Sequence, residues 1–204
     1  MEEIVRDPTL SREIKGLKFW SRKEVYEYLL DHPDFAAAIA RALGLSEYQI
    51  VRDAKFFRGA DSSYWGTDAR GATGHFWVVY GDEKKRIFFL EGTYNRKWLP
   101  TIFARGVMVL TFQHKADGEG SSVENDLYGY LKIENTFIAL LAKLLQPIMG
   151  GAMDRKMKQT LSLGARISEE AYRDPIGFFK KLEGSPELPQ QELDEFRRIL
   201  CPRC

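Results

Sequence analysis

The chain has little of several features that mark particular classes of protein. Only two cysteines occur among its 204 residues, at positions 201 and 204, so no disulfide framework is indicated. No apolar run approaches the ~20 residues that are needed to span a bilayer. The acidic start, residues 1–8, lacks the basic-then-apolar layout of a signal peptide. We therefore expect a cytoplasmic protein, unless a targeting segment has been removed.

An excess of charge of one sign is absent as well. The 30 basic residues balance 29 acidic ones, which leaves a net charge of +1. Nucleic-acid binders usually carry a clear basic excess, so we expect no nucleic-acid partner. The hydrophobic share of 44% is ordinary for a globular protein, and the length allows one well-buried core. These values leave the oligomeric state open.

Motifs for metal binding and catalysis are also lacking. The three histidines, His32, His75 and His114, are far apart and do not have the spacing of metal ligands. The pair Cys201 and Cys204 offers at most half of a zinc site, and a frayed tail is the simpler interpretation. No nucleophile elbow, phosphate loop or dinucleotide fingerprint occurs. We expect no cofactor and no metal, and we assign no catalytic residue.

What the sequence does contain is an informative order of elements. A poorly ordered lead (1–11) and a first strand (12–20) are expected before Ser21-Arg22-Lys23-Glu24, which matches a capping box and predicts a helix. A second helix, 34–43, should end at Gly44. Strands are then predicted over 48–58, 63–68, 74–80, 86–93, 104–114 and 123–133. The short polar turns between them favour an antiparallel sheet.

A long apolar helix is predicted from about Asn135. Pro147 should bend this helix, and Gly150-Gly151 should let a backbone or a ligand come close. A short segment follows Asp174-Pro175, and a last amphipathic helix is predicted over 190–200. We divide the chain into a main domain, 1–184, and a helical tail, 185–204.

This order resembles the START-like or SRPBCC superfamily, which has the helix-grip fold. The resemblance covers residues 12–170 and rests on the helix pair 21–43, the turns 65–68 and 70–74, and the helix 137–161. It implies an α+β fold, in which a curved antiparallel sheet wraps around a long C-terminal helix, with two short helices near the N-terminus. It also implies a hydrophobic cavity between sheet and helix, and ligands such as lipids, sterols, polyketides, quinones or plant-hormone-like molecules. The iron-binding Rieske branch is excluded, because no closely spaced histidine pair occurs.

Candidate residues of the cavity follow from strand alternation and from the apolar stripe of the long helix. Inward polar groups are predicted to be Arg52, His75, Glu91 and Asn125, with Arg52 and Glu91 forming a buried pair or a ligand anchor. The alternative is that a bulge or a strand end places them in solvent. The apolar lining is predicted to include Trp65, Trp77, Phe89, Val109, Phe137, Leu141, Leu144 and Ile148. The same aromatic side chains are also compatible with plain core packing.

Three functions are compatible with this interpretation. The first is binding or transport of a hydrophobic, lipid-like small molecule. The second is a polyketide cyclase or aromatase, in which His75 with Glu91 or Asp68 acts as an acid–base pair. The third is an interaction module without a ligand. The basic cluster Arg155, Lys156 and Lys158 predicts either a solvated helix face or transient contact with a membrane surface.

Overall fold

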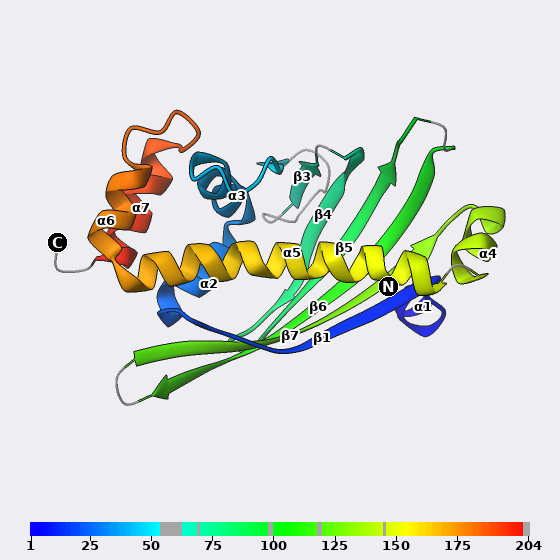
Figure 1. Cartoon of the computed structure of the whole chain (residues 1–204), viewed down its shortest axis with the longest axis horizontal. Coiled ribbons are helices and arrows are strands. Elements are labelled where there is room, and N and C mark those ends of the chain that lie inside the picture. The colour runs from blue at the N-terminus through cyan, green and yellow to red at the C-terminus, as the bar shows by residue number, and fades with distance from the viewer. Residues whose placement is uncertain (54–62, 69, 98–99, 118–119, 145, 202–204) are drawn as a thin grey trace. The chain divides into compact units, whose positions relative to one another are not determined.

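The structure is a computed structural model that describes residues 1–204 except 54–62, 69, 98–99, 118–119, 145 and 202–204 (Figure 1). Its contacts divide the chain into two compact units. The first unit comprises Met1–Leu17, Val51–Phe112 and Asn125–Gln159, and the second comprises Lys18–Ile50, Gln113–Glu124 and Thr160–Cys204. The units are made of interleaved segments, whereas the sequence predicted a simple division at residue 184.

The strands form one seven-stranded sheet in the order β1-β7-β6-β5-β4-β3-β2 (Figure 1). From β3 to β7, strands that follow one another in the chain are neighbours in the sheet, which is the antiparallel meander that the short turns predict. The strand bounds are β1 (Leu10–Trp20), β2 (Gln49–Arg52), β3 (Ser63–Thr67), β4 (Ala72–Gly81), β5 (Lys85–Tyr94), β6 (Ile102–Asp117) and β7 (Gly120–Ile133). The predicted strand 48–58 is described only as far as residue 53.

Helices precede, interrupt and follow the sheet strands, so the predicted α+β class is confirmed. They are α1 (Glu2–Arg6), α2 (Lys23–Asp31), α3 (Pro33–Ala42), α4 (Thr136–Leu144), α5 (Gln146–Arg173), α6 (Pro175–Leu182) and α7 (Gln190–Leu200). The expected single helix bent at Pro147 is instead two helices, α4 and α5. Pro147 is the second residue of α5, where its missing N–H breaks no bond inside the helix. The helix α5 continues through Gly150-Gly151.

The first residues are structured, which corrects the expectation of a poorly ordered lead. Residues 2–6 form α1, and Ile4 is buried at 2% exposure. The carboxylate of Asp7 lies 2.6 Å from the Lys132 ammonium and 3.4 Å from that of Lys143. One buried apolar side chain and two ion pairs therefore fix a segment whose sequence is mostly charged.

The expected capping box at Ser21 is also not formed. The helix α2 begins at Lys23, its N-cap is Arg22, and no side chain caps it. The Ser21 hydroxyl is buried and donates to the Arg22 carbonyl oxygen at 3.1 Å, while the Ser21 backbone N–H donates to the Ser121 carbonyl oxygen at 3.0 Å. The predicted end of α3 is confirmed, because Gly44 follows it with a left-handed φ of 65°.

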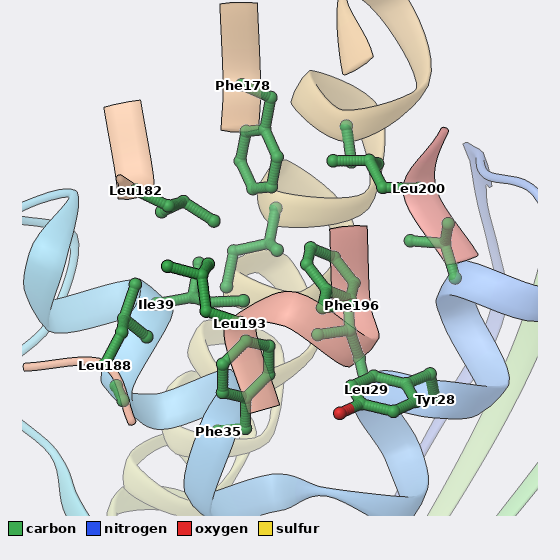
Figure 2. Close-up of a cluster of buried hydrophobic side chains, with 14 of the residues drawn as sticks. Tyr28, Leu29, Phe35, Ile39, Phe178, Leu182, Leu188, Leu193, Phe196 and Leu200 are labelled. Atoms are coloured by element: carbon green, nitrogen blue, oxygen red, sulfur yellow. The ribbon is translucent and has the colours of Figure 1, made fainter. Parts of the chain in front are cut away.

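The second unit has a dense apolar core, to which α2, α3, α5, α6 and α7 all contribute. Figure 2 shows Phe196 of α7 among Tyr28, Phe35 and Phe178. The ring centroid of Phe196 lies 5.4 Å from that of Phe35 and 5.6 Å from that of Tyr28. The segment expected to be a separate tail thus supplies part of this core.

Candidate functional site

The strand pairing fixes which side chains share a face of the sheet. Partners that lie directly opposite one another in an antiparallel pair point to the same face, and successive residues of one strand point to opposite faces. Tyr64, Phe76, Leu90 and Gly106 pair in turn across β3, β4, β5 and β6. The neighbouring row, Trp65, His75, Glu91 and Arg105, therefore lies on the other face.

Contacts of two glycines identify the face that meets the first part of α5. A Cβ placed on Gly106 would lie 3.6 Å from the side chains of both Leu90 and Leu131, so all three share a face. Gly129 is two residues before Leu131 on β7 and shares that face. A Cβ placed on Gly129 would lie 2.8 Å from Met153 Cε and 3.1 Å from Met157 Sδ. The face with Leu90, Gly106 and Leu131 is thus the one that packs on α5.

We call this surface of the first unit the inner face. Within the paired strands and β7, it carries the residues Tyr64, Gly66, Ala72, Gly74, Phe76, Val78, Gly81, Arg86, Phe88, Leu90, Gly92, Tyr94, Ile102, Ala104, Gly106, Met108, Leu110, Phe112, Asn125, Leu127, Gly129, Leu131 and Ile133.

A strip without side chains crosses the inner face. Gly66, Gly74 and Gly92 are in register across β3, β4 and β5, and Ala104 of β6 follows them. A Cβ on Gly74 would lie 2.5 Å from the Glu91 carbonyl oxygen, which leaves no room for any other residue. The strip therefore exposes backbone and the Ala104 methyl group at a position where a sheet normally presents large side chains.

The apolar side chains beside this strip are only half-buried. They are Phe76, Leu90, Ile102, Met108 and Leu131 of the sheet and Met153 of α5. Other inner-face residues are buried, namely Tyr64, Phe88, Leu110 and Leu127. A fully packed core would cover all of them. The inner face therefore keeps accessible apolar surface on the side of the sheet that packs on a helix, and this surface is the candidate site.

Three polar side chains of the first unit either lie on the inner face, as Arg86 and Asn125 do, or contact the helix that packs on it, as Asp68 does. Asn125 shares the inner face with Leu127, is 1% exposed, and donates from Nδ2 to the Leu17 carbonyl oxygen at 3.4 Å. Asp68, just after β3, forms an ion pair with Lys156 of α5 and accepts hydrogen bonds from the backbone N–H groups of Arg70 and Ala72.

These contacts determine the charge of Asp68. Burial raises the pKa of its carboxyl group, but the hydrogen bond from Lys156 and the two backbone hydrogen bonds outweigh it and hold the pKa below the usual value. Asp68 is therefore an anion at neutral pH and is not suited to act as a general acid there.

Six of the predicted lining residues do not face the long helix. By register they lie on the face opposite to the inner face: Trp65, His75, Trp77, Phe89, Glu91 and Val109. The sequence predicted that these side chains face the long helix, and that orientation is wrong. An error of one residue in the alternation along a strand exchanges its two faces. A ligand-binding role for them stays a prediction.

Contacts on that opposite face are local. His75 Nε2 lies 3.3 Å from Asp53 Oδ2, and His75 is the cross-strand partner of Glu91. Trp77 packs edge-on against Phe89, with ring centroids 5.0 Å apart, and is 5% exposed. Buried apolar side chains on both faces are the reason why alternation alone did not identify the inner face.

The remaining predicted residues are spread over several elements. The Arg52 guanidinium lies 5.9 Å from the Tyr64 ring centroid, and β3 and β4 separate β2 from the strand of Glu91, so the expected Arg52–Glu91 pair is wrong. Leu141 of α4 is 42% exposed. The side chains of Phe137, Leu144 and Ile148 lie outside the described residues.

Within the part of the chain that the structure describes, no cluster of three or more His, Cys, Asp or Glu side chains is placed to hold a metal ion. No described helix combines the length and the apolar character that crossing a bilayer requires.

Comparison with known proteins supports the fold. No family model and no curated protein matches the chain. A conserved protein from Geobacillus kaustophilus has a similar structure, with a TM-score of 0.51 and 12% identity over 79% of this chain and 94% of that one.

Weaker structural similarity extends to two named proteins. The di-domain ARO/CYC protein BexL of the BE-7585A biosynthetic pathway has a TM-score of 0.44 and 17% identity over 82% of this chain and 53% of that one. Norcoclaurine synthase from Thalictrum flavum has a TM-score of 0.43 and 13% identity over 79% of this chain and 88% of that one. At such identities structural similarity concerns the fold alone. The chain has an α+β fold of the helix-grip type, with an antiparallel sheet and a long helix near the C-terminus.

Proposed function

We propose that the chain binds an apolar small molecule on the inner face of the first unit. The observation that carries this proposal is the set of half-buried apolar side chains beside the glycine strip, on a face that packs on a helix. Apolar surface removed from water contributes about 25 cal/mol per Å². A ligand that covered about 200 Å² would gain about 5 kcal/mol, before the cost of its lost freedom.

The chemistry of the surface favours a flat or elongated apolar ligand. Phe76 and Leu90 border the strip, while Met108 and Met153 add flexible, polarizable side chains that adapt to different shapes. Gly66, Gly74 and Gly92 carry no side chains, so a ring or chain that lay on the strip would meet backbone there. These features support tolerance of shape more than selection of one polar group.

Binding is a better proposal than cyclase-type catalysis. The acid–base candidates His75 and Glu91 lie on the opposite face of the sheet. The third candidate, Asp68, is held as an anion by Lys156. His75 and Glu91 therefore point away from a ligand on the inner face, and Asp68 has no proton to donate at neutral pH and is a weakened base, because its pKa is lowered.

A pair of adjacent substitutions on β6 tests the proposal. Ala104 lies on the inner face beside Gly92, and Phe103 is the next residue, on the opposite face and 55% exposed. Purified protein is titrated with 1-aminoanthracene, a flat apolar fluorophore. Ala104→Trp should weaken its binding at least tenfold, because the indole fills the strip, and Phe103→Trp should leave binding within twofold of wild type.

The smaller substitution Ala104→Leu keeps the test valid if the tryptophan variant unfolds. Circular dichroism melting of each variant confirms that it is folded. Absence of saturable binding by the wild type, or equal effects at positions 103 and 104, would contradict an apolar site on the inner face.

A further inference from the structure

The helix α4 of the first unit, which follows β7 (Figure 1), exposes two adjacent leucines. Leu140 is 57% exposed and Leu141 is 42% exposed, whereas Ala142, on the other side of the helix, is 3% exposed. A helix that served only the fold would turn its large apolar side chains toward the protein and its alanine toward water. Among the α4 side chains that the structure describes, the arrangement is the reverse, which indicates an interaction surface.

The exposed side of this helix is a continuous face, which we call the leucine face. It consists of Thr136, Leu140, Leu141 and Lys143. Positions 136, 140 and 143 are three or four residues apart and share one stripe of the helix, and position 141 lies beside them. An ion pair fixes this orientation, because Lys143 Nζ lies 3.4 Å from Asp7 Oδ1. The leucines therefore point outward from a helix that is held in place.

The size of the leucine face argues against a second copy of the chain as its partner. A stable interface between two proteins buries about 800 Å² on each side, and two partly exposed leucines provide a small part of that area. A lipid surface needs less, because each apolar side chain gains free energy on leaving water without a matching partner surface. With nine residues, α4 is far shorter than the ~20 residues that span a bilayer. It suits a helix that lies in the membrane surface.

The charge of this region suits lipid headgroups. Residues 135–153 contain one charged residue, Lys143, and no acidic one. A lysine beside apolar side chains can keep its stem in the acyl region and its ammonium among the headgroups. Asp7 is shared between Lys143 and Lys132, whose Nζ lies 2.6 Å from Asp7 Oδ2. One anion between two cations leaves a net positive charge, which favours anionic headgroups.

We propose that the leucine face docks α4 on the surface of a phospholipid membrane. Leu140 and Leu141 enter the acyl region, and Lys143 meets the headgroup phosphates. The sequence predicted membrane contact for the basic cluster of α5, but Lys156 of that cluster forms an ion pair with Asp68. The inference does not depend on the proposed apolar site, since docking needs only the surface of α4.

Co-sedimentation of the full chain with vesicles of phosphatidylcholine and phosphatidylglycerol in equal amounts tests the proposal. The wild type should bind saturably. Leu140→Ser should weaken binding about threefold or more, and the double variant Leu140→Ser/Leu141→Ser about tenfold or more, because serine gains little on leaving water. Ile176→Ser, at a 55% exposed apolar position of α6, is the matched control and should bind as the wild type does. Lys143→Gln should bind these vesicles more weakly, and pure phosphatidylcholine vesicles as the wild type does.

Three outcomes would overturn the proposal. The wild type does not bind vesicles saturably, or Ile176→Ser weakens binding as much as Leu140→Ser. The third is a wild-type dimer in sedimentation velocity that the double variant dissociates, because the leucines would then cover a second copy.

Circular dichroism melting confirms that each variant is folded. Titration with 1-aminoanthracene separates the result from the apolar site, because the double variant should bind the fluorophore as the wild type does. Loss of fluorophore binding by the double variant would place the leucines in the apolar site and contradict docking as their role.

Discussion

Gly129 of β7 lies against Met153 of α5 so closely that a Cβ at position 129 would come within 2.8 Å of the methionine Cε. This contact determines which face of the sheet packs on the helix in the first unit. With the register of β3 to β6, it assigns the glycine strip and the half-buried apolar side chains to the inner face. The proposed apolar site depends on that assignment.

The Gly129–Met153 contact predicts a compensating pair of substitutions. Gly129→Val should destabilise the protein by about 1–3 kcal/mol, because the added methyl groups overlap the methionine side chains. Met153→Ala in the same chain should recover part of that loss, since it removes the atoms that are overlapped. Urea unfolding of both single variants and the double variant measures the coupling. Strictly additive effects would show that the two residues do not touch.

Gly164 provides a contrasting prediction within the same helix. It lies inside α5, and a Cβ placed there would meet nothing within 4 Å. Gly164→Ala should therefore stabilise the protein by about 0.5–1 kcal/mol, because alanine loses less backbone freedom in a helix. An increase in Tm on thermal unfolding is the expected result, and a decrease would show that this position is packed.

The Asp68–Lys156 ion pair predicts a dependence of stability on pH. The folded-state pKa of Asp68 lies below the unfolded value of about 3.9, so its contribution is present above that value and is lost as pH falls through the folded pKa. Asp68→Asn keeps an oxygen acceptor but loses the charge, and should cost about 1–2 kcal/mol at pH 7 after allowance for the exposure of Lys156.

Urea unfolding at a series of pH values measures this effect. The difference in unfolding free energy between wild type and Asp68→Asn should shrink as pH falls below about 4. In a Lys156→Gln background, Asp68→Asn should cost less than it does in the wild type. A difference that stays constant from pH 7 to pH 3 would argue against a stabilising charge at this position.

The burial of Phe196 predicts that the second unit needs α7 for its stability. The side chain is fully buried among the rings of Tyr28, Phe35 and Phe178 (Figure 2). Phe196→Ala should cost about 3–5 kcal/mol, the usual range for removing a buried aromatic ring. Ile176→Ala, at a 55% exposed position of α6, is the matched control and should change stability by less than about 0.5 kcal/mol. Similar small effects at both positions would mean that α7 is a dispensable tail.

Much of the fold was predictable because turns and helix ends are local signals. The order of strands, the helix pair before them and the left-handed Gly44 all follow from neighbouring residues. Two terminal segments were less predictable, because their order depends on distant partners. Ile4 and Asp7 are fixed by burial and by lysines on β7 and α4, and Phe196 by a core drawn from five helices.

The candidate site was less predictable, for a reason visible in β4. Its two faces carry His75, Trp77 and Val79 on one side and Phe76, Val78 and Tyr80 on the other in simple alternation, so hydrophobicity does not separate them. A bulge between Val78 and Tyr80 shifts the phase further along this strand. Strand pairing brings Gly66, Gly74 and Gly92 together into one strip. Their spacing in the sequence depends on the lengths of the loops between the strands, so the spacing alone does not indicate the strip.

Methyl NMR of the protein titrated with 1-aminoanthracene tests the central claim most directly. Leu90 and Leu131 on the inner face and Met153 on α5 should show saturable shifts, whereas Val107 and Val109, on the opposite face of β6, should not. Shifts confined to Val107 and Val109, or no saturable shift at Leu90, Leu131 and Met153, would contradict an apolar binding site on the inner face.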